Sequence, residues 1–121
     1  MRINHLNLCV PDVPRTAQFF AEYFGFQMTE QKGREALCVL FDDSGFAFIL
    51  TNFDRATKPE YPRDFHIGFI QDGKEQVEAI YQRLKTAGYV EKAPQSMHGS
   101  WGFYFYAPGG IHVEVSCPLD R

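Results

Sequence analysis

The stretch FYFYAPGGIHVEV, residues 103–115, has the pattern of two strands joined by a tight turn. The first half is a run of four aromatic residues, and in the second half β-branched residues alternate with polar ones. The four residues from Ala107 to Gly110 are rich in turn formers. Glu114 stands between two valines in the second half. Because a carboxylate on a half-buried strand is costly to desolvate, Glu114 needs either a positive partner or a face turned to water.

Length and composition describe an ordinary globular protein. The 121 residues are the length of one domain, residues 1–121, with 45% hydrophobic and 22% charged residues. The net charge of −3 without a basic cluster predicts no nucleic-acid partner. The first ten residues resemble neither a signal peptide nor a membrane span, so we expect no membrane association. Three isolated cysteines (Cys9, Cys38 and Cys117) indicate reduced thiols in a cytoplasmic protein.

A proline-containing linker, residues 54–63, divides the chain into modules 1–53 and 64–121 with the same order of elements. In the first module a helix is expected over residues 13–24, capped by Asp12 and ended by Gly25. Strands are expected at residues 3–10, 26–31, 35–41 and 46–51. The module is therefore β-α-β-β-β.

The second module repeats this order. Asp72 and Glu75 have the spacing of a capping box, and Gly88 ends the helix that follows. The apolar stripe of this helix is Val77, Ile80, Leu84 and Ala87. Strands are expected at residues 65–71, 89–93, 101–106 and 111–117. The predicted fold class is α+β.

Aligning the two modules matches His5 with His66 and Ile49 with Glu114. Because alternate residues of a strand share a face, both histidines and the glutamate fall on the polar face of their strands. In a single curved sheet, these faces would line its hollow. Two imidazoles and one carboxylate form a set that suits a divalent transition metal and leaves coordination positions open.

Simpler roles compete with this one. A single histidine on a strand is more often a hydrogen-bonded structural residue than a ligand, and Glu114 alone can face solvent. His112 is expected to be solvated or to hydrogen-bond from the second shell of the site. His98, in the predicted loop 95–100, is as consistent with an ordinary loop residue as with an acid–base group.

Three segments together resemble the vicinal oxygen chelate superfamily: NHLNLCVPDVPRTAQFFAEYFGF (residues 4–26), FHIGF (residues 65–69) and FYFYAPGGIHVEV. That group includes glyoxalase I, type I extradiol dioxygenases, fosfomycin-resistance proteins and bleomycin-resistance proteins. The resemblance implies two β-α-β-β-β modules forming a curved mixed sheet around a metal and substrate cavity. It implies a metal held by His5, His66 and Glu114, and a homodimer in which two chains complete each site.

Differences between this sequence and the branches of the superfamily reduce the number of reactions expected. Ile49 stands where glyoxalase I has a further glutamate, so lactoylglutathione lyase activity is not expected. Asn7 stands where fosfomycin-resistance enzymes have a threonine. The extradiol signature has an aromatic-Tyr pair, a proline turn and then the ligand glutamate, and Phe103-Tyr104, Ala107-Pro108 and Glu114 are similar to it. Ser96, two residues before His98, is atypical of the signature.

The sequence therefore predicts a small metal-dependent enzyme that acts on an oxygen-chelating small molecule, by dioxygenase or by lyase or isomerase chemistry. The metal would be Fe(II), Mn(II), Zn(II) or Ni(II). Tyr104 would donate a hydrogen bond to the reacting oxygen, and His98 is a candidate for proton transfer. The alternative is a non-catalytic protein that sequesters a flat ligand, as bleomycin-resistance proteins do.

Overall fold

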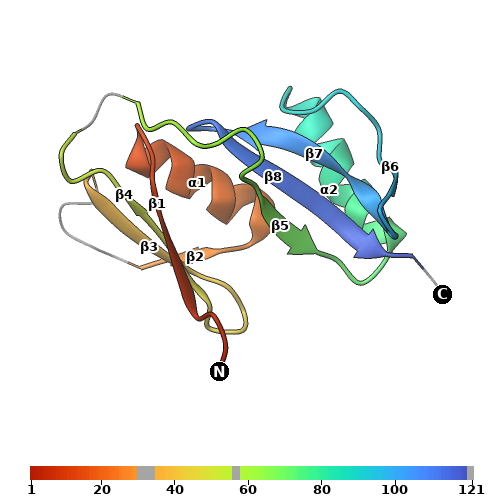
Figure 1. Ribbon diagram of the computed structural model, residues 1–121, viewed down its shortest axis with the longest axis horizontal. Helices are drawn as coiled ribbons and strands as arrows, with labels where there is room; N and C mark the ends of the chain where they lie inside the picture. The colour runs from red at the N-terminus through yellow and green to blue at the C-terminus, as the bar shows by residue number, and fades with distance from the viewer. Residues whose placement is uncertain (30–34, 56–57, 120–121) are drawn as a thin grey trace. The chain divides into compact units, whose positions relative to one another are not determined.

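The computed structural model describes residues 1–29, 35–55 and 58–119. The chain divides into two compact units, Met1–Glu60 and Tyr61–Arg121 (Figure 1). The boundary between the units falls inside the predicted linker, 54–63. Residues 56–57 of this linker and residues 30–31 of the predicted strand 26–31 lie outside the described residues.

The first unit contains one helix and one four-stranded mixed sheet. Its elements are β1 (His5–Cys9), α1 (Val13–Phe24), β2 (Gln27–Met28), β3 (Leu37–Phe41) and β4 (Ala47–Thr51). The strand order is β1-β4-β3-β2, with β1 parallel to β4 and the other neighbours antiparallel. Helix α1 packs on β3 and β4, on one face of the sheet.

Helix α1 begins and ends where the sequence predicts. The Asp12 carboxylate accepts a hydrogen bond from the backbone N–H of Arg15 at 3.1 Å, and Gly25 adopts a left-handed conformation with φ 71°. The helix is anchored to the sheet by Phe20, whose ring meets that of Phe48 edge-on at 5.0 Å.

The turn between β3 and β4 is organised by one carboxylate. Asp42 Oδ1 accepts hydrogen bonds from the Ser44 hydroxyl at 2.8 Å, and from the backbone N–H groups of Ser44 and Phe46 at 2.9 Å each. These bonds, the one from the Ser44 hydroxyl first, hold the pKa of Asp42 below its ordinary value of 3.8.

The second unit repeats the arrangement. Its elements are β5 (Ile67–Ile70), α2 (Lys74–Thr86), β6 (Gln95–Met97), β7 (Ser100–Ala107) and β8 (Ile111–Pro118). The strand order is β5-β8-β7-β6, with β5 parallel to β8, and α2 packs on β7 and β8 (Figure 1). The predicted α+β fold of two β-α-β-β-β modules is confirmed, and its strands form two four-stranded mixed sheets, one in each unit.

Two details of α2 differ from the prediction. The helix is capped by Gly73 rather than Asp72, and it has no side-chain cap hydrogen bond. Because the helix starts one residue later than expected, the carboxylate of Asp72 lies outside the capping position. The buried stripe is Val77, Tyr81 and Leu84. Of the other residues predicted for it, Ile80 is half-buried and Ala87 is exposed.

The predicted strand at residues 89–93 is wrong. This segment is irregular, and the second strand of the unit is β6, in the stretch that was expected to be a loop. His98 and Gly99 join β6 to β7 in a two-residue turn with φ 43° and 81°. Positive φ at both positions is the geometry of a type I′ hairpin turn, which the sequence reading overlooked.

Alternation along β8 separates the core from the site, as predicted. Ile111, Val113 and Val115 are fully buried on the side of α2. His112, Glu114 and Ser116 lie on the opposite face and are half-buried.

Candidate functional site

Glu114 lies on the face of the second sheet that is opposite helix α2. Its strand, β8, lies between β5 and β7, and Glu114 pairs with Gly68 on one side and Tyr104 on the other. A side chain at Gly68 would meet nothing within 4 Å, so the space beside Glu114 on the β5 side is open. His66 lies just before β5, and its side chain is next to that of Glu114.

Two side chains contact the same oxygen of Glu114. The Tyr104 hydroxyl donates a hydrogen bond to Glu114 Oε1 at 2.9 Å, and His66 Nε2 lies 3.4 Å from that atom. The side chain of Glu114 is 20% exposed and that of His66 is 41% exposed. The structure therefore brings together three predicted site residues, and the positive partner that Glu114 requires is either a protonated His66 or a bound cation.

The other ring nitrogen of His66 fixes its tautomer. Nδ1 lies 3.1 Å from the backbone carbonyl oxygen of Asp64, which can only accept, so Nδ1 carries a proton. In the neutral ring, Nε2 then points its lone pair toward a carboxylate oxygen, an arrangement that is repulsive unless a cation lies between them. Histidines that bind metals commonly donate their second N–H to a backbone carbonyl in this way.

The separation of the two atoms fits neighbouring ligands of one metal ion. Nitrogen and oxygen ligands about 2.0–2.1 Å from a tetrahedral zinc are roughly 3.3–3.4 Å apart. The observed distance of 3.4 Å between His66 Nε2 and Glu114 Oε1 agrees with this spacing. No group of three histidine, cysteine, aspartate or glutamate side chains gathers at one point in the described ranges, so the pair requires a further ligand.

His5, the third predicted ligand, belongs to the first unit. It is exposed at the start of β1, and its Nδ1 lies 2.7 Å from the side-chain oxygen of Asn4. Because that oxygen only accepts, Nδ1 carries the proton in the neutral ring and Nε2 keeps its lone pair. That His5 joins His66 and Glu114 stays a prediction.

The strand registers agree with the repeat alignment. In the first unit, Asn7, two residues after His5, pairs with Ile49. In the second unit, Gly68, two residues after His66, pairs with Glu114. Ile49 therefore takes the place of Glu114 in the first sheet, and it offers no atom that can bind a metal or a proton.

Four rings, those of His66, Tyr104, His112 and Tyr106, form a chain of contacts near Glu114. The His66 ring lies 5.5 Å from Tyr104 and 6.1 Å from His112, and Tyr106 stacks on His112 at 4.5 Å. Burial, followed by the hydrogen bond and charge of Glu114, raises the pKa of Tyr104 above 10.0. Burial, followed by the charge of His66, lowers the pKa of His112 below 6.5.

His98 lies apart from this cluster. It is exposed at the tip of the β6–β7 turn, and Tyr104 lies four positions after Ser100, the first residue of β7. At the rise of a strand, these four residues span about 13 Å. The structure therefore does not place His98 beside Glu114.

Sequence reasoning missed two parts of this site. The carbonyl of Asp64 fixes the His66 ring, but a backbone acceptor leaves no signal in residue types. The stacking of Tyr106 on His112 depends on the register of the hairpin. Ala107 pairs with Ile111, so the turn is 108–110 rather than the expected 107–110, and Tyr106 lies opposite His112.

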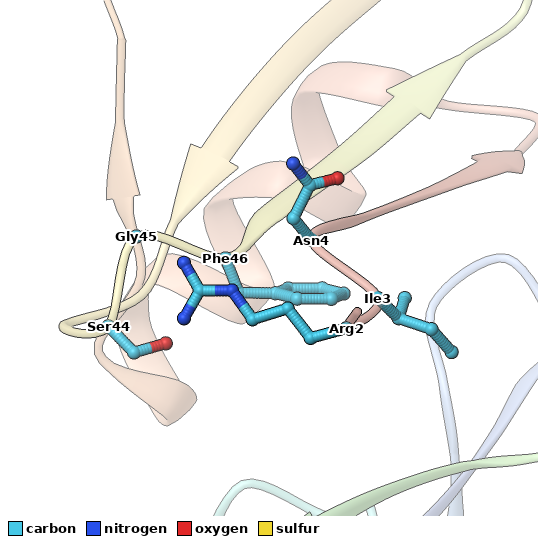
Figure 2. Close-up of a pocket in the computed structure, with 6 residues that line it drawn as sticks. All are labelled: Arg2, Ile3, Asn4, Ser44, Gly45 and Phe46. Atoms are coloured by element: carbon cyan, nitrogen blue, oxygen red, sulfur yellow. The ribbon is translucent and has the colours of Figure 1, made fainter.

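A small surface pocket of about 60 Å³ lies elsewhere, in the first unit (Figure 2). It is lined by Arg2, Ile3, Asn4, Ser44, Gly45 and Phe46. It has room for a few water molecules only and contains none of the predicted site residues.

The model of the Glyoxalase/Bleomycin resistance protein/Dioxygenase superfamily matches residues 2–115. The chain belongs to this superfamily. Its membership confirms the resemblance seen in the sequence and agrees with the paired modules of the fold. No curated protein matches the chain.

Solved structures of the superfamily share the fold over nearly the whole chain. A possible glyoxalase from Bacillus cereus is 38% identical, with a TM-score of 0.85 and coverage of 97% of this chain and 99% of that one. A lactoylglutathione lyase from Agrobacterium tumefaciens is 17% identical, with a TM-score of 0.74 and coverage of 96% and 92%. A fosfomycin resistance protein from Listeria monocytogenes is 20% identical, with a TM-score of 0.73 and coverage of 98% and 94%. At these lower identities the likeness concerns the fold alone.

Neither helix of the described superfamily domain is long and apolar enough to cross a membrane.

Proposed function

We propose that this superfamily member is a small metal-dependent enzyme acting on a small molecule that chelates the metal through two adjacent oxygens. His5, His66 and Glu114 would hold Fe(II), Mn(II), Zn(II) or Ni(II). One observation carries the proposal: His66 Nδ1 is held by the Asp64 carbonyl while Nε2 lies 3.4 Å from Glu114 Oε1. When His66 is neutral, the lone pair of Nε2 and the carboxylate oxygen favour a cation between them.

The chain's own residues would orient the site. When bound, the ion would supply a Lewis acid that attracts adjacent substrate oxygens and stabilises negative charge on them. The Asp64 carbonyl holds the His66 ring, and the Tyr104 hydroxyl holds Glu114. Because the pKa of Tyr104 is raised, the hydroxyl keeps its proton and remains a donor at neutral pH.

The reaction is proposed only at the level of class, as dioxygenase or as lyase or isomerase chemistry. Ile49, in place of a further carboxylate, argues against lactoylglutathione lyase activity. Proton transfer by His98 stays a prediction, which His98→Ala tests through the pH profile of any activity found. We also propose that the protein is a cytoplasmic homodimer.

Elemental analysis of the purified protein, after reconstitution with each candidate ion, tests the proposal. The wild type is expected to retain about one metal ion per chain. His5→Ala, His66→Ala and Glu114→Ala are expected to lose it, whereas the control His112→Ala on the same face keeps it. A wild type that retains no ion would exclude the metal-dependent enzyme.

The second candidate is a non-catalytic protein that sequesters a flat ligand, and the exposed Tyr106 ring favours it. This role needs ring surfaces but no metal. Ligand binding that is unchanged in His66→Ala would support sequestration, whereas binding lost on chelation of the metal would support the enzyme.

A further inference from the structure

A tight turn at residues 62–65 leads directly into His66. The backbone N–H of Phe65 donates a hydrogen bond to the carbonyl oxygen of Pro62 at 3.0 Å, which closes a four-residue β-turn. The peptide group between Asp64 and Phe65 lies in the second half of this turn. Its orientation is therefore held by the bond to Pro62.

The same peptide group also holds the His66 ring. Its N–H is the group bonded to Pro62, and its C=O, which belongs to Asp64, accepts a hydrogen bond from His66 Nδ1 at 3.1 Å. Because a peptide group is planar, its N–H and C=O point in opposite directions and can only rotate together. The bond that closes the turn therefore fixes the direction of the carbonyl that orients the imidazole.

Two side-chain contacts span or border this turn. The rings of Tyr61 and Phe65, which flank it, are stacked with centroids 5.2 Å apart and planes that differ by 17°. An ion pair joins Arg63 Nε to Asp64 Oδ1 at 3.7 Å, but both side chains are more than 90% exposed, at 94% and 95%, so it contributes little. Of the two contacts, the stacked rings are the stronger, and they favour the closed turn.

We propose that Tyr61 is a positioning residue for the metal site. Through its stack on Phe65 it holds closed the turn whose peptide group orients His66. When the turn opens, the carbonyl leaves Nδ1 and the imidazole is free to rotate away from the orientation that directs Nε2 toward Glu114. The inference rests on the proposed function, in which His66 binds the metal.

Two measurements on the zinc-loaded protein test this role. Zinc is diamagnetic, and sites of nitrogen and oxygen ligands that hold the other candidate ions also bind it. Proton NMR follows the exchange of the His66 Nδ1 proton with water, and competition with a coloured chelator gives the dissociation constant of zinc. In Tyr61→Ala the exchange is expected to be about three- to tenfold faster, the scale of one lost stacking contact, because the proton is released when the turn opens. The dissociation constant is expected to rise by up to about tenfold.

Matched variants separate the ring from other effects. Tyr61→Phe keeps the ring and is expected to match the wild type in both measurements. Tyr61→Leu keeps an apolar side chain without the ring and is expected to behave like Tyr61→Ala. Arg63→Ala, the control on the same turn, removes only the exposed ion pair and is expected to match the wild type.

Unchanged proton exchange in Tyr61→Ala and Tyr61→Leu would overturn the role of the stack. Faster exchange with an unchanged dissociation constant would also overturn it, because the turn would then open without affecting the ligand. Both results leave the proposed function standing, since the wild type still binds zinc. A wild type that takes up no metal ion would overturn the proposed function and the positioning role with it.

Discussion

At the scale of single residues, the Tyr104 hydroxyl already has a hydrogen-bond partner in Glu114. The sequence suggested that Tyr104 donates to a substrate oxygen, but its hydroxyl proton is directed to Glu114 Oε1 at 2.9 Å. A donor held in this way orients the carboxylate before any ligand arrives. We infer that Tyr104 positions Glu114, and its donation to a substrate oxygen stays a prediction.

Removing this hydroxyl should weaken metal binding without unfolding the protein. Tyr104→Phe is expected to raise the dissociation constant of the metal about tenfold, because Glu114 loses the bond that orients it. Competition with a coloured chelator measures the constant. The control is Tyr81→Phe, which removes a hydroxyl bonded to the Glu91 carbonyl on the helix side. Equal metal affinity in both variants would return Tyr104 to a role at the substrate.

Asp42 gives a residue-scale prediction about stability and pH. Its pKa is lower in the folded chain than the ordinary 3.8, so the ionised form is favoured by folding. The resulting stability is fully present well above pH 3.8 and is lost as the pH falls through the lower, folded-state value. The gain is small, because the carboxylate is exposed to solvent.

Two variants test this account of the 42–46 turn. Asp42→Ala is expected to lower the free energy of unfolding at pH 6 by roughly 0.5–1 kcal/mol, since three hydrogen bonds are exchanged for bonds to water. Asp42→Asn keeps an acceptor oxygen without the charge, so the pH-dependent part should vanish. Urea unfolding at pH 3 and pH 6 measures both. A difference between wild type and Asp42→Asn that is the same at both pH values would contradict the assignment.

At the scale of elements, the sequence predicted correctly those helix ends that are determined by contacts within one helical turn. Both ends of α1 follow from Asp12 and Gly25, whose effects act within one helical turn. The start of α2 was missed because Asp72 and Gly73 are competing caps and only the folded backbone decides between them. The strand β6 was missed because only Met97 of its three residues is apolar, and the strand forms by pairing with β7, which is a tertiary contact.

The uncapped start of α2 leaves room for stabilisation. Gly73 has φ −159°, which any residue adopts, and an added side chain would approach only the flexible end of Gln76, at 3.2 Å. Gly73→Asp is expected to raise the free energy of unfolding by a few tenths of a kcal/mol, because its carboxylate can accept from the free N–H groups of the first turn.

The same residues test the rejected capping box. Asp72→Ala should leave the free energy of unfolding nearly unchanged, since Asp72 does not cap the helix. Urea titration of both variants beside the wild type measures the difference. A larger loss in Asp72→Ala than the gain in Gly73→Asp would restore Asp72 as the cap.

At the scale of the whole molecule, the repeat located much of the candidate site. Matching the modules directed attention to His66 and Glu114, which the structure brings within 3.4 Å. The Asp64 carbonyl and the stacked Tyr106 were not found, because they depend on backbone geometry and pairing rather than residue type. Whether His5 acts within its own chain or in a second copy is a question about assembly.

Mixing inactive variants answers that question. His5→Ala and His66→Ala each lack one proposed ligand. If the ligands come from two chains, random mixed dimers regain an intact site and the mixture should recover about a quarter of the wild-type metal content. Elemental analysis after mixing, partial unfolding and refolding measures this, with each variant refolded alone as the control. No recovery would assign all three ligands to one chain.

The matched registers of the two sheets also show what it would take to rebuild the Glu114 position in the first module. Asn7 fills the place that Gly68 leaves open, and its side chain accepts a hydrogen bond from Thr51 at 2.8 Å. A glutamate introduced at Ile49 alone would meet this engaged amide rather than an open space. The two modules thus differ at two paired positions, and a single mutation does not convert the first into the second.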